Sequence, residues 1–234
     1  MNWGLQWPTE TYPIIVADPP WDFRTYSKKG RGRSPDQHYP VMSLQDITDL
    51  PVSQLVQKQT TLFLWTTWDL SEYAQSVVMP AWGFKYKTDA FVWAKSKKHL
   101  DKIMLKAFRR WQKTGEMPDP IQFLYSMFRM GKGYYTRKET EVCLLGTTKG
   151  VLPRSDKGVP DLIVGGVREH SRKPDETYDR IERLYDVDSY LELFARASNR
   201  PRWDAWGNDT DKFEINEPRH DAVAIPRSQS VQGR

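Results

Sequence analysis

The sequence contains one cysteine, four histidines and no long hydrophobic run in 234 residues. The single cysteine, Cys143, excludes an intrachain disulfide and is typical of proteins in a reducing compartment. The histidines lack metal-ligand spacing, so we expect no metal site. No apolar run reaches the roughly 18 residues of a membrane span, and residues 1–4 do not resemble the start of a secretory signal. No glycine-rich loop ends in Gly-Lys-Ser or Gly-Lys-Thr, which argues against a phosphate-handling NTPase.

Positive charge is concentrated in two segments. The net charge is only +5, but residues 24–33 carry +5 and residues 85–138 carry +10, which leaves −10 on the rest of the chain. Aromatic residues lie among these charges, for example Tyr26, Trp93, Phe108, Trp111, Tyr134 and Tyr135. A single basic run is usually a solvated surface, but two runs mixed with aromatics favour phosphate contacts and base stacking. We predict nucleic-acid contacts from Arg24, Lys28, Lys29, Arg31, Arg33, Lys97, Lys98, Arg109, Arg110 and Arg137.

The order of apolar segments predicts an α/β fold. Short apolar runs indicate buried strands at residues 14–17, 62–65, 90–93, 142–145, 162–164 and 191–194. They are nearly continuous rather than alternating, as in a sheet covered on both faces. A helix can begin in residues 71–78, and the pattern from Pro174 to Tyr185 predicts another, with Tyr178 and Ile181 on one face. Strands that alternate with helices predict a doubly wound, mostly parallel sheet.

Residues 96–135 interrupt this alternation. From Leu100 to Trp111 the apolar residues have helical spacing, with Lys and Arg between them. We interpret this region as a basic insertion over the sheet edge and a candidate target-recognition region. The remainder of residues 1–213 is expected to form a single domain. Residues 214–234 are polar and aperiodic, which predicts a disordered tail.

Asp18-Pro19-Pro20-Trp21 follows the first predicted strand directly, where open α/β sheets bind ligands. The two prolines make a stiff turn that can aim a carboxylate and a carbonyl at one small group. An adenine amino group is such a target: Asp18 could accept one hydrogen and the Pro19 carbonyl the other, which frees the nitrogen lone pair for attack on a methyl donor. Trp21 would then stack on the flipped base. The alternative is a rigid turn with a core tryptophan.

The motif order resembles the N(6)-adenine methyltransferases of the D-P-P-W type, which include the catalytic subunit of the mRNA adenosine methyltransferase and many bacterial and phage proteins. The resemblance runs from Tyr12 to Asp211. It rests on I-I-V-A-D-P-P-W at 14–21, H-Y-P-V-M at 38–42, L-F-L-W at 62–65, F-V-W-A-K at 91–95, G-K-G-Y-Y-T-R-K-E-T-E at 131–141, R-K-P-D-E at 172–176, L-E-L-F-A-R at 191–196 and W-x-x-W-G-N at 203–208. It implies a Rossmann-like, circularly permuted methyltransferase fold that uses S-adenosylmethionine.

The resemblance also implies residue roles. The catalytic residues would be Asp18, Pro19, Pro20, Trp21 and Tyr39, the last in a gate loop. The donor would contact Asp18, Lys173 through its carboxylate, Glu192, Phe194, Arg196 and Asn199 in a ribose-binding turn, and Asn208 at the adenine edge. Two positions depart from the family: Ser198 stands where His is frequent, and Asp209 where Gln is frequent. Nothing within residues 1–13 can be assigned to the donor amine.

The resemblance implies a site-specific adenine methyltransferase whose partner is a nucleic acid. The compact chain favours DNA over RNA by family analogy. The same reaction on RNA adenosine is the first alternative, and a catalytically silent nucleic-acid-binding scaffold is the second, although the acid of the D-P-P-W motif is present. We expect a monomer or a homodimer without membrane contact, in the cytoplasm of a bacterial or phage-infected cell or in another intracellular compartment.

Overall fold

The computed structural model describes residues 6–22, 41–131, 135–168, 172–196, 200–208 and 210. Its centre is a seven-stranded sheet with the order β5-β3-β4-β2-β1-β6-β7. The strands are β1 (Tyr12–Ala17), β2 (Val56–Thr66), β3 (Lys85–Ser96), β4 (Thr140–Thr147), β5 (Leu162–Gly166), β6 (Tyr190–Leu193) and β7 (Trp203–Trp206). The predicted α/β fold is confirmed, and β7, which the sequence showed only as a motif, is an additional strand.

Six strands run in the same direction, and β4 runs antiparallel to both of its neighbours, β2 and β3. The sheet is therefore mostly parallel, as predicted. The exception has a chemical consequence, because the first residues of β4 lie at the same edge of the sheet as the carboxyl ends of the other strands. This edge is where ligands bind in open α/β sheets.

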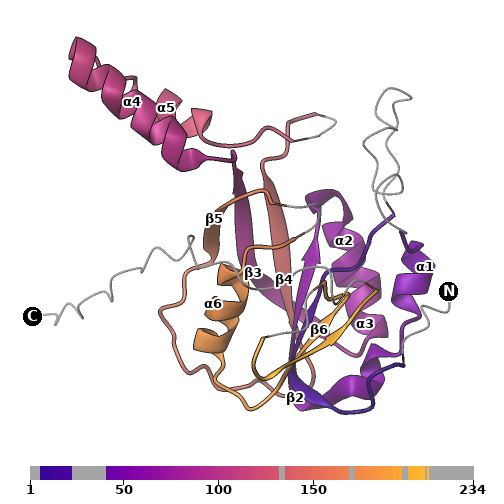
Figure 1. Cartoon of the computed structure of the whole chain (residues 1–234). Helices are drawn as coiled ribbons and strands as arrows, with labels where there is room; N and C mark the ends of the chain where they lie inside the picture. The colour runs from indigo at the N-terminus through magenta and orange to yellow at the C-terminus, as the bar shows by residue number, and fades with distance from the viewer. Residues whose placement is uncertain are drawn as a thin grey trace, which may run out of the picture.

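Helices cover both faces of the sheet (Figure 1). On one face lie α1 (Leu44–Thr48), the 3₁₀ turns Val52–Leu55 and Trp68–Leu70, and a continuous helical stretch made of α2 (Ser71–Tyr73), a π segment (Ala74–Val78) and α3 (Met79–Ala81). On the other lies α6 (Glu176–Leu184). Successive residues of β1 point to opposite faces, so Ile15 packs in the first layer and Ile14 in the second.

Two predicted helices differ from the structure in detail. The helix expected from residue 71 forms, but it contains a π segment just before Pro80. Pro80 has no N–H group to continue the hydrogen-bond ladder. Just before it, the Met79 N–H bonds to the Ala74 carbonyl, five residues back instead of four. The helix expected from Pro174 begins at Glu176, because Pro174 supplies the carbonyl that accepts from the Thr177 N–H at 3.0 Å in the preceding turn.

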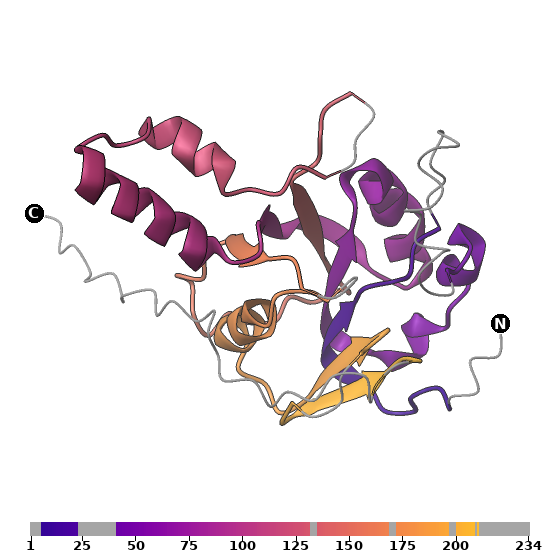
Figure 2. The ribbon, with the colours of Figure 1, turned by 45° about the horizontal axis from the view of Figure 1, so that its top comes forward.

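The segment between β3 and β4 extends away from the body of the protein (Figures 1 and 2). It contains α4 (Leu100–Thr114) and α5 (Pro120–Ser126), and neither helix buries a residue. The predicted helical spacing from residue 100 is therefore correct. The expected tail, residues 214–234, lies outside the described residues. Among the helices that are described, none is both long and apolar enough to cross a membrane.

Candidate active site at the carboxyl edge of the sheet

Four charged side chains of alternating sign lie at the carboxyl edge of the sheet. They are Asp18 after β1, Lys173 before α6, Glu141 at the start of β4 and Lys95 near the end of β3. Lys173 Nζ donates to Asp18 Oδ2 at 2.6 Å and lies 3.5 Å from Glu141 Oε2. Lys95 is paired with the other carboxylate oxygen of Glu141. The Trp65 ring lies 5.5 Å from Lys173 Nζ, whose side chain is only 7% exposed.

The two carboxylates of this cluster differ in their electrostatics. Burial raises the pKa of Asp18, against the opposing effect of Lys173. Burial also acts to raise the pKa of Glu141, but Lys173 and Lys95 together hold it below its usual range. Glu141 is therefore held as an anion by two lysines, Lys173 and Lys95, whereas Asp18 is paired with Lys173. Lys173 lies between Asp18 and Glu141. It can therefore release one of these carboxylates to bind another anion while the second carboxylate keeps it in the site.

The Asp18–Trp21 segment forms a tight turn after β1. The Trp21 N–H donates to the Pro19 carbonyl at 2.8 Å, and the Met42 N–H donates to the Pro20 carbonyl at 3.0 Å. Both prolines have a fixed φ, so the turn is stiff. A carbonyl oxygen has two lone pairs, and the Pro19 carbonyl can thus accept a second hydrogen while it stays bonded to Trp21.

Trp21 is a core residue in this structure. It is 5% exposed, and its indole Nε1 donates to the Trp65 carbonyl at 2.9 Å. This packing corresponds to the rigid turn with a core tryptophan that the sequence left open. Stacking of Trp21 on a base would require the indole to be uncovered first, and it stays a prediction.

Glu192 and Phe194 lie at the carboxyl end of β6. Tyr178 of α6 donates its hydroxyl to Glu192 Oε1 at 2.7 Å. Burial raises the pKa of Glu192 to about 7. Phe194 has φ +65°, a left-handed conformation that residues other than glycine seldom adopt. Strained backbone of this kind is concentrated at functional sites, which fits the predicted donor turn.

The end of β7 packs directly on the turn after β6. The Ala195 N–H donates to the Trp206 carbonyl at 2.9 Å. A Cβ atom at Gly207 would lie only 2.2 Å from the Ala195 carbonyl oxygen, so this position requires glycine. Asn208 follows and is exposed. The close approach therefore fixes the predicted adenine-reading residue relative to the predicted ribose turn.

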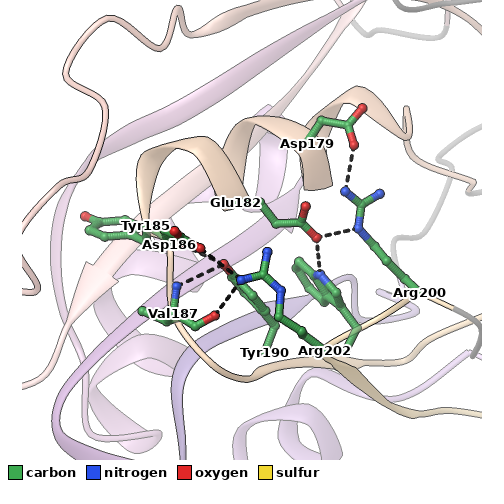
Figure 3. A network of polar contacts seen from close by, with 9 residues as sticks. Asp179, Glu182, Tyr185, Asp186, Val187, Tyr190, Arg200 and Arg202 are labelled. Atoms are coloured by element: carbon green, nitrogen blue, oxygen red, sulfur yellow. Dashed lines mark hydrogen bonds and ion pairs between the residues drawn. The ribbon is translucent and has the colours of Figure 1, made fainter.

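A network of ion pairs ties α6 to the segment before β7 (Figure 3). Arg200 Nε donates to Glu182 Oε1 at 2.7 Å, and its Nη2 donates to Asp179 Oδ1 at 2.6 Å. The indole of Trp203 donates to the same Glu182 oxygen at 2.7 Å. Arg202 is held separately by Asp186 Oδ1 at 2.9 Å. The start of β7 is thereby anchored to the helix that also carries Tyr178.

The structure places several predicted donor residues together and leaves others undescribed. Lys173 contacts Asp18 directly, and the charge of Arg196 acts on the same carboxylate. Tyr39 and Asn199 lie outside the described residues, as do the two departures from the family pattern at 198 and 209.

The predicted nucleic-acid residues fall into two groups. Those in the first basic segment, Arg24, Lys28, Lys29, Arg31 and Arg33, lie outside the described residues. The others, Lys97, Lys98, Arg109, Arg110 and Arg137, are all exposed. They lie after β3, on α4 and before β4. All five therefore belong to residues 97–139 between these strands, which we call the basic arm, and not to the sheet.

The aromatic residues of the second basic segment separate into exposed and buried members. Phe108, Trp111 and Tyr135 are exposed, the last by 94%. Trp93 was wrongly grouped with them, since it is 3% exposed and its indole donates to the Gly165 carbonyl at 3.0 Å. Because Trp93 lies on β3 against β5, its ring faces the core. Tyr26 and Tyr134 lie outside the described part of the chain.

The sequence alone indicates no role for Glu141, Lys95 or the Tyr178 hydroxyl. Glu141 directly precedes one predicted strand and Lys95 closely follows another, so charge at a strand boundary was the available signal. The signal was incomplete, because Glu141 reaches this edge only through the antiparallel direction of β4. Within the described part of the chain, no three His, Cys, Asp or Glu side chains gather as metal ligands would.

Comparison with known protein families shows which family this chain belongs to. The MT-A70 family model matches residues 12–118 and 105–209, which together include every strand of the sheet and the charged cluster. The chain belongs to the MT-A70 family. Membership confirms the predicted family and its methyltransferase chemistry, with S-adenosylmethionine as the methyl donor.

Relatives of two kinds share the MT-A70 pattern. The type II methyltransferase M.MunI from Mycoplasma sp is 29% identical over 91% of this chain and 84% of its own length. The human N(6)-adenosine-methyltransferase catalytic subunit METTL3 is 29% identical over 91% of this chain and 30% of its own. The N(6)-adenosine-methyltransferase MT-A70-like protein of Arabidopsis thaliana is 30% identical over 88% of this chain and 25% of its own length. The chain thus spans most of M.MunI but less than a third of these two eukaryotic relatives.

Proposed function

We propose that this protein transfers the methyl group of S-adenosylmethionine to the exocyclic amino nitrogen of adenine in DNA, at specific sites. The observation that carries the proposal is the Asp18 carboxylate, held on a stiff turn at the carboxyl edge 2.6 Å from Lys173. The N(6)-adenosine specificity in the names of several relatives supports the choice of the amino nitrogen.

Asp18 and the Pro19 carbonyl would activate the acceptor. An adenine amino group is a poor nucleophile, because its lone pair is delocalised into the ring. Asp18 accepts one of its hydrogens, and the second lone pair of the Pro19 carbonyl accepts the other. The nitrogen then becomes more tetrahedral and its lone pair becomes available for the methyl group. The proton that the nitrogen must lose on methylation can pass to the Asp18 carboxylate. When bound, S-adenosylmethionine supplies a methyl group already activated by a sulfonium, so positioning and electrostatics provide most of the catalysis.

The chemistry of the edge residues fits this donor. An ammonium at Lys173 suits a carboxylate, the Glu192 carboxylate suits ribose hydroxyls, and the Asn208 amide suits the edge of an adenine. Lys173 contacts Asp18 after β1, Glu192 lies on β6 and Asn208 follows β7. These three strands are neighbours in the sheet. Adjacent strands lie about 4.8 Å apart, so this spread suits a donor that is itself elongated.

Lys173 links the two substrates. It neutralises Asp18 in the structure, while Glu141 and the Trp65 ring hold it from other sides. Lys173 can exchange Asp18 for the donor carboxylate and remain anchored to Glu141. The exchange leaves Asp18 able to accept a hydrogen from the adenine amine. We therefore propose that the donor binds before the nucleic acid.

DNA is the preferred substrate, and RNA adenosine is the alternative. Similarity over most of the length of a type II methyltransferase supports DNA, while similarity to N(6)-adenosine methyltransferases supports RNA. A silent scaffold is disfavoured because both Asp18 and its lysine partner are present and in contact. The donor residues all come from one chain, which supports a monomer or a homodimer of complete sites. The buried Cys143 and the nucleic-acid substrate support an intracellular location.

The substrate proposal is tested by calorimetry followed by turnover. S-adenosylmethionine should bind the purified protein saturably without nucleic acid. Methyl transfer to a DNA oligonucleotide pool should then exceed transfer to an RNA pool of the same sequences, measured as kcat/KM. Absence of donor binding up to millimolar concentration, with or without nucleic acid, contradicts the proposed activity. A faster reaction on RNA selects the alternative.

The basic arm should provide much of the affinity for nucleic acid. Reversing Lys97, Lys98, Arg109 and Arg110 to Glu should weaken binding to all sequences alike. It should also flatten the slope of log affinity against log salt by about 3–4, because fewer counterions are released. The measurement is a fluorescence-anisotropy titration at several salt concentrations.

The matched control reverses four exposed lysines at the opposite edge of the sheet: Lys58, Lys85, Lys87 and Lys149. It makes the same change in net charge but should leave most of the salt slope intact. An equal effect of both quadruple variants would show that only total charge matters. Loss of sequence preference with an unchanged slope would instead place the arm against bases.

A further inference from the structure

Tyr178 joins α6 to the donor edge of the sheet. Its hydroxyl donates to Glu192 Oε1 at 2.7 Å. Burial and the Glu192 carboxylate raise the pKa of Tyr178 well above its usual value, so the hydroxyl keeps its proton and remains the donor of this bond. The proposed methyl transfer needs no proton from Tyr178. The hydrogen bond from Tyr178 to Glu192 must therefore have a different role.

The ring of Tyr178 is held from two sides. Trp203 packs edge-on against it, with ring centroids 5.1 Å apart. The guanidinium of Arg200 lies 5.6 Å from its centroid. Arg200 is itself fixed by Asp179 and Glu182, at 2.6 and 2.7 Å (Figure 3). A phenol clamped in this way can hold its hydroxyl at one point with little loss of conformational freedom.

We propose that Tyr178 is a positioning residue for the methyl donor, whose hydroxyl fixes one oxygen of Glu192 and orients the other toward the ribose hydroxyls. The inference rests on the proposed role of Glu192 in the donor site. An ionised carboxylate has about four acceptor lone pairs, so one bond to Tyr178 leaves enough for two hydroxyls. A free carboxylate would have to be ordered at the moment of binding, which costs affinity.

The same bond controls the charge of Glu192. Four groups act on this carboxyl: Tyr178 of α6, Asp18 after β1, Lys173 before α6 and Arg200 before β7. Burial raises its pKa to about 7 and Asp18 acts in the same direction, whereas Tyr178, Lys173 and Arg200 lower it. Removal of the Tyr178 hydroxyl should therefore raise the pKa of Glu192 further, and a larger fraction would be protonated at neutral pH. A protonated carboxyl is a poorer acceptor for ribose hydroxyls.

The test is the dissociation constant of S-adenosylmethionine for the full chain, measured by calorimetry from pH 6 to pH 9.5. Tyr178→Phe should bind about tenfold more weakly near pH 6.5, the value expected for a lost hydrogen bond to a charged group. The deficit should shrink as pH rises and Glu192 ionises. Turnover at saturating donor should change little. The α-amino group of the donor titrates alike with every variant, so it cancels in the ratio of dissociation constants.

Tyr190→Phe is the matched control. Tyr190 is a buried tyrosine of the same region whose hydroxyl donates to the Tyr185 carbonyl at 2.6 Å (Figure 3). Its loss should lower the melting temperature without altering the pH profile of donor binding. In a Glu192→Gln background, the Tyr178→Phe change should have almost no further effect on affinity.

The outcomes separate this inference from the proposed function. If the wild-type protein does not bind the donor, the proposed function fails. If it binds and Glu192→Gln weakens binding, but Tyr178→Phe behaves as wild type, the positioning role is wrong. A deficit that is equal at every pH and shared by Tyr190→Phe would also overturn it, since it would reflect general destabilisation.

Discussion

Replacing Asp18 by alanine is expected to reduce methyl transfer about a thousandfold or more, while the affinity for S-adenosylmethionine changes less than about tenfold. The acceptor amine loses its carboxylate partner, so the nitrogen lone pair is no longer released. Donor affinity survives because Lys173 keeps its contacts with Glu141 and the Trp65 ring. Single-turnover kinetics at saturating enzyme and calorimetry with the donor measure the two quantities separately.

The matched control for this substitution is Asp204→Ala. Asp204 accepts a hydrogen bond from the Tyr12 hydroxyl at 2.8 Å, and it lies on β7 before the carboxyl edge. Its loss should cost about 1 kcal/mol of stability and leave turnover nearly normal. Near-normal turnover of the Asp18 variant would disprove the assigned chemistry. A loss of donor binding as large as the loss of turnover would place Asp18 in the donor site alone.

Replacing Lys173 by methionine is expected to lower the free energy of unfolding by about 3–5 kcal/mol at pH 8, because removal of one partner leaves a buried charge uncompensated. Glu141 still has Lys95, but Asp18 loses its 2.6 Å partner. Burial already raises the pKa of Asp18, and without the lysine it should rise further. The folded variant then binds a proton that the unfolded chain releases, so its stability should fall as pH rises between the unfolded and folded pKa values.

Urea unfolding at pH 5 and pH 8 measures this dependence. The difference between Lys173→Met and wild type should be smaller at pH 5, where Asp18 is more protonated in the variant. Lys173→Arg keeps the positive charge and should show a smaller loss at pH 8. If the methionine variant loses less than about 1 kcal/mol, or the same amount at both pH values, the ion pair does not have the assigned role.

The sequence predicted the sheet strands because each is a short apolar run, and residues 14–17 are the clearest case. It did not reveal β7, since Trp203–Trp206 is only four residues long and has just its two end residues buried. Nor did it predict the direction of β4. The direction of β4 depends on the path of the basic arm between β3 and β4. The pattern of apolar residues within a single strand gives no information about that path.

The same limit applies to the site. Asp18 could be identified because the turn chemistry around it is local. Glu141 and Lys173 are 32 residues apart in the numbering. Lys173 meets both Glu141 and Asp18 only because the start of β4, the end of β1 and the segment before α6 lie at one edge of the sheet. The Tyr178 hydroxyl was missed for another reason. Helical spacing correctly placed the Tyr178 ring on the buried face of the helix, and a residue predicted to pack in the core gave no indication that its hydroxyl bonds to Glu192. Trp21 shows the converse, since its ring was assigned to a base and the structure places it in the core.

The role of Asp18 in directing a methyl group to the amino nitrogen of adenine can be measured in the product itself. DNA is incubated with the enzyme and isotopically labelled S-adenosylmethionine and digested to nucleosides, and the labelled product is identified by mass spectrometry. The wild-type protein should give labelled N6-methyl-2′-deoxyadenosine, and Asp18→Ala should give none above background. A label on any other atom or base, or equal labelling by the two proteins, would contradict this role of Asp18.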